Sequence, residues 1–388
     1  MSIELAARAL HFIYTRNELD EFRKHLETCD QPAADVIHVE QEFSTMDEAQ
    51  RWLSALTQPR SGMLVSVAGN THVVARQDTD TWRLVRTLSP QELDQRPATQ
   101  RFVEVADGVS LWVETWGPEE APAILLIMGA NASGLAWPDE LMALLSKRHR
   151  VIRYDHRDTG ASTWAFDTKP YPITRLAEDA VAVLDALGIS RAHVVGMSLG
   201  GLLVQLLLLD HPQRLLSATV FGIPALSGTP ALEDGTAPAP IDEGLLEFWS
   251  HMFEPRDLEA ELDWRVENWR RLHGRVLPFD AEEYRALERR IIRHAGRHDN
   301  PGAHARAGTA GLERGAQLAH VTVPTLVIAT PEDPINPAPN ARHLAGNLPH
   351  STLVTLEGMG HALPRVLVPS LAAALLGHVE AVERGTGK

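Results

Sequence analysis

From residue 101 onward, short apolar runs alternate with segments whose apolar residues recur every three or four positions. The short runs are typical of buried strands and the periodic segments of amphipathic helices. The strand-like runs are AILLIMG, VIRYD, AHVVGM, SATVFG, PTLVIAT and STLVTLEG, and the helical segments include ITRLAEDAVAVLDALG and PSLAAALLGHVEAV. This alternation predicts right-handed crossovers and a mainly parallel sheet covered on both faces. We therefore predict an α/β domain over residues 101–388, opened by a hairpin that turns at Asp107-Gly108.

One stretch of this domain departs from the strand and helix rhythm. Residues 224–320 begin with the Pro, Gly and Ala-rich sequence PALSGTPALEDGTAPAP and continue with helical patterns such as DLEAELDWRVENWRRL. An insert of helices between two strands predicts a helical cap over the edge of the sheet. The arginines of the insert alternate with Glu, which favours a solvated helix face over an anion site.

The first part of the chain has a different organisation. Helical patterns and short apolar runs follow one another within residues 1–95, and Thr45 with Glu48 has the spacing of a capping box. The segment SPQELDQRPATQ, residues 89–100, is polar and carries two prolines, as linkers do. We predict a small α+β domain of unknown role that ends near residue 95 and could mediate oligomerisation.

Charge and cysteine content narrow the partners and the compartment. The 388-residue chain has a formal net charge of −15, which argues against nucleic-acid and anionic-membrane partners, because these are bound by clustered Lys and Arg. Cys29 is the only cysteine, so an intramolecular disulfide is excluded. The first residues lack signal-peptide features, and no apolar run reaches the roughly 18 residues of a membrane span. We predict a cytoplasmic protein with a small-molecule partner.

The sequence GMSLG, residues 196–200, matches the pattern G-x-S-x-G where a predicted strand meets a predicted helix. In that context the pattern holds a serine in a strained turn, and its glycines leave room for the hydroxyl to stand clear. The helix that follows directs N–H groups toward the same point, where they can stabilise an oxyanion. Ser198 is therefore our candidate nucleophile, although an inert serine in a glycine-rich turn remains the alternative.

A serine hydroxyl becomes a nucleophile only when a base takes its proton, and that base must be oriented by a carboxylate. His361 lies in the glycine-bearing loop EGMGHALP after one predicted strand, and Asp333 lies in TPEDPINP after another. The carboxyl ends of parallel strands meet at one sheet edge, so both loops are expected beside Ser198. Glu332 is the rival acid. The order Ser, Asp, His is that of a known class of serine hydrolases.

An oxyanion needs two backbone N–H groups aimed at it. We predict Leu199, the residue after the nucleophile, and Ala130 in the small-residue loop MGANASG, with Asn131 nearby. Met197 adjoins the nucleophile and is expected in the pocket. Four aromatic residues of the insert could line an apolar substrate pocket or could instead pack the insert on the sheet: Trp249, Phe253, Trp264 and Trp269.

These motifs resemble the α/β-hydrolase superfamily, and more closely the aclacinomycin methylesterase group of bacterial polyketide-tailoring enzymes. The likeness rests on LLIMGANASGLAWPDE, VIRYDHRDTGAS, AHVVGMSLGG, VTVPTLVIATPEDPINPAPNARHLAG and GMGHALP, and it covers about residues 101–388. It implies the α/β-hydrolase fold and a cofactor-free carboxylic ester hydrolase, whose substrate in that group is a methyl ester on a glycosylated aromatic polyketide. The group's nucleophile, acid and base fall on Ser198, Asp333 and His361, and its oxyanion donors on Ala130 and Leu199. Residues 1–95 lie outside the likeness.

We thus expect a hydrolase that passes through an acyl-enzyme on Ser198, with no cofactor and no metal, because the sequence offers neither an H-E-x-x-H motif nor paired cysteines. A small hydrophobic ester, such as a methyl ester, is the expected substrate. Lactone, thioester or carbon–carbon bond hydrolysis and perhydrolase activity are alternatives on the same fold. A non-catalytic ligand-binding protein is the alternative from another class. Asp155, Arg157 and Gly160 in YDHRDTGAS are expected to stabilise a turn rather than to take part in catalysis.

Overall fold

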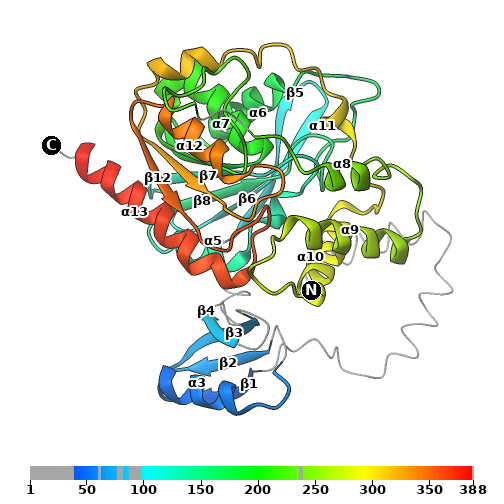
Figure 1. Cartoon of the computed structure of the whole chain (residues 1–388), viewed down its shortest axis with the longest axis vertical. Coiled ribbons are helices and arrows are strands. Elements are labelled where there is room, and N and C mark those ends of the chain that lie inside the picture. The colour runs from blue at the N-terminus through cyan, green and yellow to red at the C-terminus, as the bar shows by residue number, and fades with distance from the viewer. Residues whose placement is uncertain (1–38, 60–62, 77–81, 87–97, 236–238, 387–388) are drawn as a thin grey trace. The chain divides into compact units, whose positions relative to one another are not determined.

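A computed structural model describes residues 39–59, 63–76, 82–86, 98–235 and 239–386 (Figure 1). The helical patterns expected before residue 39, together with Cys29 and most of the expected linker, lie outside these residues.

The larger domain is built on an eight-stranded sheet with the strand order β12-β11-β10-β9-β7-β8-β6-β5. Its strands are β5 (Thr99–Ala106), β6 (Val109–Trp116), β7 (Ala123–Ile127), β8 (Arg150–Tyr154), β9 (Ala192–Met197), β10 (Leu215–Phe221), β11 (Thr325–Ala329) and β12 (Ser351–Thr355). The strands from β7 to β12 run parallel, while β5 and β6 form the predicted antiparallel hairpin. Fully apolar strands such as β7 and β9 are buried along their whole length, as parallel strands covered on both faces must be.

Helices cover both faces of this sheet (Figure 1). Helices α6 (Thr174–Ala186), α7 (Leu199–Asp210) and α12 (Ala338–Gly346) pack into one hydrophobic core. Helices α5 (Asp139–Leu145) and α13 (Val368–Thr386) pack into the core on the opposite face. The predicted mainly parallel α/β architecture is confirmed.

One helical stretch among the described residues, Arg365–Gly385, is long and apolar enough to cross a membrane, with a mean hydropathy of 1.5. Its apolar residues Leu371, Leu375 and Val379 are buried in the core beneath the sheet. Packing against the sheet therefore accounts for the apolar residues on one side of this helix.

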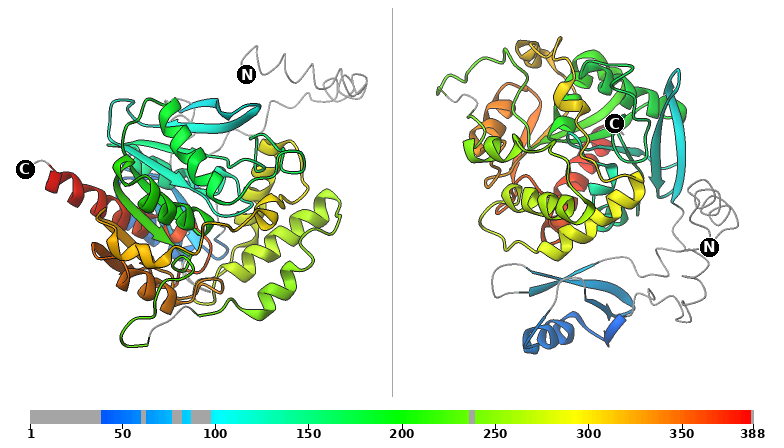
Figure 2. Two further views of the ribbon diagram at one scale, coloured as in Figure 1. Left: turned by 90° about the horizontal axis from the view of Figure 1, so that it is seen from above. Right: turned by 90° about the vertical axis from the view of Figure 1, so that its right-hand side faces the viewer.

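The expected insert consists of helices that lie between β10 and β11 in the sequence. They are α8 (Glu243–Trp249), α9 (Leu258–Leu272), α10 (Ala281–Ala295) and α11 (Ala303–Arg306), followed by the short 3-10 helix η3 (Gly315–His320). Aspartates cap the first three: the side chains of Asp242, Asp257 and Asp280 each accept a bond from a first-turn N–H. Helices α8, α9 and α10 lie beside one end of the sheet instead of over its faces (Figures 1 and 2).

A small N-terminal domain precedes the α/β domain and has its own core. It comprises β1 (Val39–Phe43), α3 (Met46–Ala55), β2 (Leu64–Val67), β3 (Asn70–Arg76) and β4 (Trp82–Arg86), with the strands in sequential order. Leu53 of the helix packs against Val65 and Val74 of the sheet. The Thr45 hydroxyl accepts the Glu48 N–H as a capping box requires. The α+β character is confirmed, while the boundary near residue 95 and any role in oligomerisation stay predictions.

Candidate active site

Ser198 occupies a strained turn between β9 and α7. Its backbone has φ = 55° and ψ = −126°, in the left-handed region that non-glycine residues rarely adopt. Two flanking glycines make the turn possible: a Cβ added to Gly196 would lie 2.2 Å from the Gly200 carbonyl oxygen, and one added to Gly200 would lie 2.0 Å from that of Ile127. The predicted G-x-S-x-G turn is therefore formed, and its glycines are required by close backbone contact.

His361 and Asp333 come together at the same edge of the sheet. Asp333 follows β11, His361 follows β12, and His361 Nδ1 lies 2.7 Å from Asp333 Oδ2. The other carboxylate oxygen of Asp333 accepts the N–H groups of Ile335 and Asn336, each at 2.8 Å. Burial acts to raise the pKa of Asp333, but the neighbouring His361 and these N–H groups outweigh burial and lower the pKa below its ordinary value.

The rival acid Glu332 is turned away from His361. One of its carboxylate oxygens, Oε2, accepts the backbone N–H of Arg275 at 3.4 Å, and its own N–H donates to the Met359 carbonyl at 3.0 Å. Of the two neighbouring carboxylates, the structure brings Asp333 to the histidine.

The loop that carries His361 is fixed by the end of helix α9. The His361 N–H donates to the Leu272 carbonyl at 2.6 Å. A Cβ added to Gly360 would lie 2.4 Å from the His273 carbonyl oxygen, so glycine is needed for this approach. The insert thus contributes directly to the position of the histidine.

The two candidate oxyanion donors also reach this edge. Leu199 is the first residue of α7, and the first N–H groups of a helix have no acceptor within the helix. Ala130 follows β7 in a loop that passes close to the nucleophile, since a Cβ on Gly129 would lie 3.1 Å from the Ser198 Cβ. Asn131, with φ = 59°, donates its N–H to Nδ1 of His304 at 3.0 Å.

These groups share a cavity of about 350 Å³ between the sheet edge and the insert. Ser198, His361, Ala130 and Leu199 line it, and so do the predicted pocket residues Asn131, Met197, Trp249, Trp264 and Trp269. Residues that the sequence did not single out also line it, among them Met252, Arg265, Asn268, Glu288, Asn300 and His304. The three tryptophans therefore contact the cavity, which favours the pocket interpretation over packing alone.

The prediction for Phe253 was wrong. Its side chain is 55% exposed and does not line the cavity. It lies against Gly302, where an added Cβ would be 2.8 Å from its Cε1 atom. Met252, the preceding residue in the same turn, lines the cavity instead.

Comparison with known proteins agrees with this architecture. Residues 122–364 match the family model described as the α/β hydrolase fold. Rhodomycin D methylesterase of Streptomyces peucetius is 43% identical over 291 residues, which are 71% of this chain and 96% of that protein. The chain belongs to the α/β-hydrolase family.

Solved structures of other hydrolases show the same fold. A hydrolase from Pseudomonas aeruginosa PA01 is 29% identical with a TM-score of 0.55, over 72% of this chain and 98% of that chain. A 2-hydroxy-6-oxo-6-phenylhexa-2,4-dienoate hydrolase from Rhodococcus sp. strain RHA1 covers 74% of this chain and 100% of its own with a TM-score of 0.57. At 20% identity that second likeness concerns the fold alone. The resemblance to the methylesterase group, inferred from the motifs, is confirmed.

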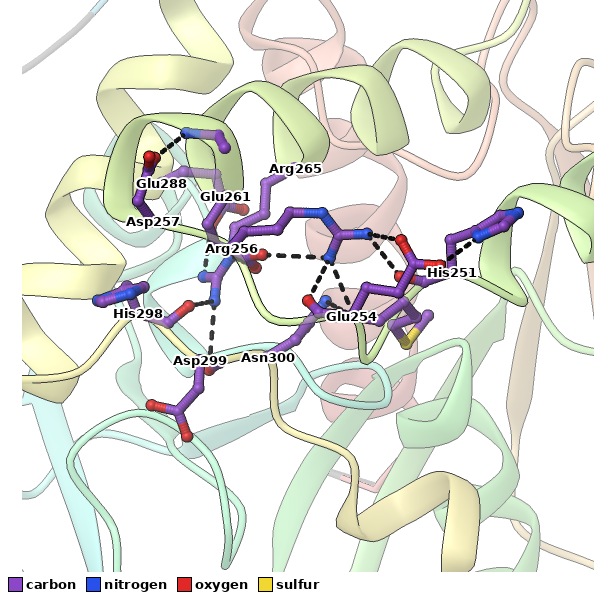
Figure 3. Close-up of polar contacts among 12 residues, drawn as sticks. His251, Glu254, Arg256, Asp257, Glu261, Arg265, Glu288, His298, Asp299 and Asn300 are labelled. Atoms are coloured by element: carbon purple, nitrogen blue, oxygen red, sulfur yellow. Dashed lines mark hydrogen bonds and ion pairs between the residues drawn. The ribbon is translucent and has the colours of Figure 1, made fainter.

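A buried ion network forms part of the cavity wall of this hydrolase (Figure 3). Arg265 Nε lies 2.7 Å from Glu261 Oε1, and Arg265 Nη1 lies 3.0 Å from Glu288 Oε2. Burial acts to lower the pKa of Arg265, but the two carboxylates outweigh burial and raise it, so the guanidinium stays charged. The solvated face expected for the arginines of the insert is thus wrong for Arg265, which pairs with carboxylates on two helices.

Hydrogen bonds fix two of the wall tryptophans in place. Trp269 Nε1 donates to Glu288 Oε1 at 2.6 Å, and Trp249 Nε1 donates to Asn268 Oδ1 at 2.8 Å. The third, Trp264, stacks on Phe248 with ring centroids 4.9 Å apart. An apolar wall of flat, fixed rings suits a flat apolar ligand.

Asp155 and Arg157 hold the loops around the hydrolase site in place through hydrogen bonds and an ion pair. Asp155 Oδ1 accepts the Ser133 hydroxyl at 2.6 Å and the Gly134 N–H at 2.8 Å, while Oδ2 accepts the Ala161 N–H at 2.8 Å. Arg157 pairs with Asp179 through two guanidinium nitrogens. Both side chains therefore hold loops in place, as predicted from the sequence.

Proposed function

We propose that this hydrolase cleaves a carboxylic ester with Ser198 as nucleophile, His361 as base and Asp333 as the group that orients the base. The proposal is carried by one observation: His361, which lies 2.7 Å from Asp333, lines the same cavity as a serine held in a strained turn. The family membership and the name of the methylesterase relative support ester hydrolysis.

In the acylation step, His361 Nδ1–H is held by Asp333, which leaves Nε2 to accept a proton. As Nε2 takes the hydroxyl proton, Ser198 Oγ forms a bond to the ester carbonyl carbon, and the carbonyl π electrons move to its oxygen. The N–H groups of Ala130 and Leu199 stabilise that oxyanion. The intermediate then collapses, the bond to the alkoxy oxygen breaks, and His361 gives its proton to the departing alcohol.

In the deacylation step, His361 takes a proton from water while the water oxygen attacks the acyl carbon. Collapse of this second tetrahedral intermediate breaks the bond to Ser198 Oγ, which regains a proton from His361. The carboxylic acid leaves and the enzyme returns to its starting state. Asp333 stabilises the imidazolium in both steps, and its lowered pKa keeps it ionised throughout.

The lining of the cavity favours an uncharged aromatic ester as the substrate. We propose that the ester cleaved is a methyl ester, so that methanol is the leaving alcohol. Arg256 and Arg265 together balance the charges of Glu261 and Glu288, so this wall offers no unpaired charge to a charged ligand. The fixed rings of Trp249, Trp264 and Trp269 present apolar surface. The relative of Streptomyces peucetius is itself named as a methylesterase.

Labelling and hydrolysis test the proposal together. A serine-directed fluorophosphonate should label the wild type and the control variant Ser250→Ala, which removes a hydroxyl at an exposed helix end. Ser198→Ala should neither be labelled nor hydrolyse any ester. Labelling that persists in Ser198→Ala contradicts the assignment of the nucleophile.

The substrate class is tested with a panel of short aliphatic esters, bulky aromatic methyl esters, lactones and thioesters. The aromatic methyl esters should give the highest kcat/KM, because they fill the apolar wall of the cavity. A higher kcat/KM for lactones or for thioesters would show that the protein is a lactonase or a thioesterase instead. An absence of any hydrolysis by the untreated wild type across the whole panel would favour a ligand-binding role.

A further inference from the structure

Two buried histidines contact the loop that follows β7. His156, in the loop after β8, donates from Nε2 to the Met128 carbonyl at 2.9 Å. His304, from α11 of the insert, accepts the Asn131 N–H at Nδ1 at 3.0 Å. The two rings meet edge to face with centroids 5.5 Å apart. The loop is thus held at two points by side chains from distant parts of the sequence.

The bonds of His304 fix its tautomer. Nδ1 accepts a hydrogen bond, so the proton is on Nε2, which donates to the Arg157 carbonyl at 3.1 Å. Burial lowers the pKa of His304 to about 3, with His156 acting in the same direction and the Arg157 carbonyl opposing it. At neutral pH His304 is therefore an uncharged acceptor, and protonation of Nδ1 would break the bond to Asn131.

The two contacts bracket one peptide group. The Met128 carbonyl belongs to the peptide before Gly129, and the Asn131 N–H belongs to the peptide after Ala130. Between them lies the peptide that carries the Ala130 N–H, the proposed oxyanion donor. Because Asn131 gives its own N–H to His304, that group is already engaged, which leaves Ala130 to face the oxyanion.

We propose that His304 is a positioning residue that orients the Ala130 N–H toward the oxyanion, an inference that rests on the proposed function. His304 acts on the reaction through the Ala130–Asn131 peptide. It also ties the oxyanion loop to the insert, whose tryptophans line the substrate cavity. A donor held in place before the reaction stabilises a developing charge more than one that must reorient.

Three substitutions separate the two hydrogen bonds of His304. His304→Phe keeps a ring and removes both bonds. His304→Asn places an amide oxygen near the position of Nδ1, where it can accept from Asn131, whereas His304→Gln places its amide near Nε2, facing Arg157. We expect kcat to fall about 10- to 100-fold in His304→Phe, with KM changed less than about 3-fold, since only transition-state stabilisation is lost. His304→Asn should recover most of kcat and His304→Gln should not.

The rate of fluorophosphonate labelling provides a second readout, because its phosphoryl oxygen enters the same oxyanion hole. Labelling rates should follow the order wild type, Asn, Gln, Phe. His343→Phe is the matched control: His343 is fully buried and donates to the Pro230 carbonyl at 2.8 Å outside the cavity, so its loss should lower Tm and leave kcat unchanged. If labelling depends on Ser198, the proposed function is supported. The ratio of the labelling rates of His304→Asn and His304→Gln separately tests whether His304 positions the Ala130 N–H.

The proposal is overturned if His304→Gln matches or exceeds His304→Asn, or if His304→Phe raises KM without lowering kcat. Thermal unfolding of each variant shows whether it is folded at the assay temperature. The comparison of Asn with Gln is then decisive even if His304→Phe unfolds.

Discussion

His361 Nδ1 lies 2.7 Å from Asp333 Oδ2, whereas the carboxylate of the adjacent Glu332 accepts the Arg275 N–H. Neighbouring residues in one loop thus face different partners. Asp333 is 3% exposed, and every hydrogen bond that its carboxylate makes favours the ionised form.

Asp333→Asn should therefore lower kcat far more than Glu332→Gln does. The asparagine cannot stabilise an imidazolium and favours the wrong tautomer of His361, so we expect a decrease on the order of 10⁴-fold. Glu332→Gln should stay within about 3-fold of wild type, because Glu332 does not touch the histidine. Steady-state kinetics on one ester decides the matter. Equal losses in the two variants would contradict the assignment of Asp333.

The lowered pKa of Asp333 also predicts a pH dependence of stability. A carboxylate whose pKa is lower in the folded protein than in the unfolded chain stabilises the fold above the unfolded value of 3.8. This contribution is lost as the pH falls through the folded-state pKa. The part of the free energy of unfolding that wild type owes to the Asp333 carboxylate, and that Asp333→Asn lacks, should thus shrink as the pH falls below about 4. Urea unfolding of both proteins across this pH range measures the difference in their free energies of unfolding. A difference that does not change with pH would contradict the lowered pKa of Asp333.

The close contact at Gly200 predicts a structural requirement of the serine turn. A Cβ at this position would lie 2.0 Å from the Ile127 carbonyl oxygen, so Gly200→Ala must push α7 away from β7. We expect a loss of about 3 kcal/mol in the free energy of unfolding. Gly377→Ala is the control, because no atom lies within 4 Å of the added Cβ on the exposed face of α13. That variant should gain about 0.5 to 1 kcal/mol, and the reverse order of stabilities would rule out the turn geometry.

Much of this arrangement could be predicted because it depends on local sequence. The alternation of apolar strands and helices determines that Ser198, Asp333 and His361 follow parallel strands, and parallel strands deliver their following loops to one edge. A strained serine turn needs glycines on both sides, and the motif displays them. Each of these constraints involves only the few residues around one catalytic candidate. The sequence alone therefore predicts which strand each of the three residues follows.

The parts that could not be predicted depend on partners far away in the sequence. In the sequence, nothing distinguishes Arg265 from the other arginines of a charged helix. Its partner Glu288 is 23 positions away and comes into contact with it only in the folded protein. His304 lies in GAHARAG, which has no motif and no periodicity, and its acceptor role depends on Asn131, 173 positions earlier. Met252 and Phe253 differ little in hydrophobicity, so which of them faces the cavity is decided by the turn in which they lie.

A partly buried carboxyl in the insert predicts a second pH effect, of opposite sign. Burial raises the pKa of Glu283 to about 7, and nearby Asp280 and Glu140 add to this, while Arg365 and its N–H oppose it. Since the folded-state pKa is above the unfolded one, stability falls as the pH rises from about 4.5 to about 7. Glu283→Gln keeps an acceptor for the Arg365 N–H and has no proton to lose.

We therefore expect Glu283→Gln to be more stable than wild type at pH 8, on the order of 1 kcal/mol, and equally stable near pH 4.5. The exposed neighbour Glu282 provides the control, since Glu282→Gln should show no such pH-dependent gain. Chemical unfolding at the two pH values measures both variants. A gain for Glu283→Gln that is the same at both values would show that the carboxyl does not titrate in this range.

The contrast between Trp264 and Phe253 predicts which aromatic residue of the insert controls specificity. Trp264 lines the cavity, whereas Phe253 is 55% exposed and lies outside it. Trp264→Ala removes apolar surface that a large acyl group would cover, at about 25 cal/mol per Å². The kcat/KM ratio of a bulky aromatic methyl ester to a short aliphatic ester should fall about 10- to 100-fold, because the short ester does not reach this wall. The ratio is independent of the fraction of enzyme that is folded, so a loss of stability cannot imitate the result. Phe253→Ala should leave the ratio unchanged, and equal ratios in the two variants would exclude Trp264 from the substrate pocket.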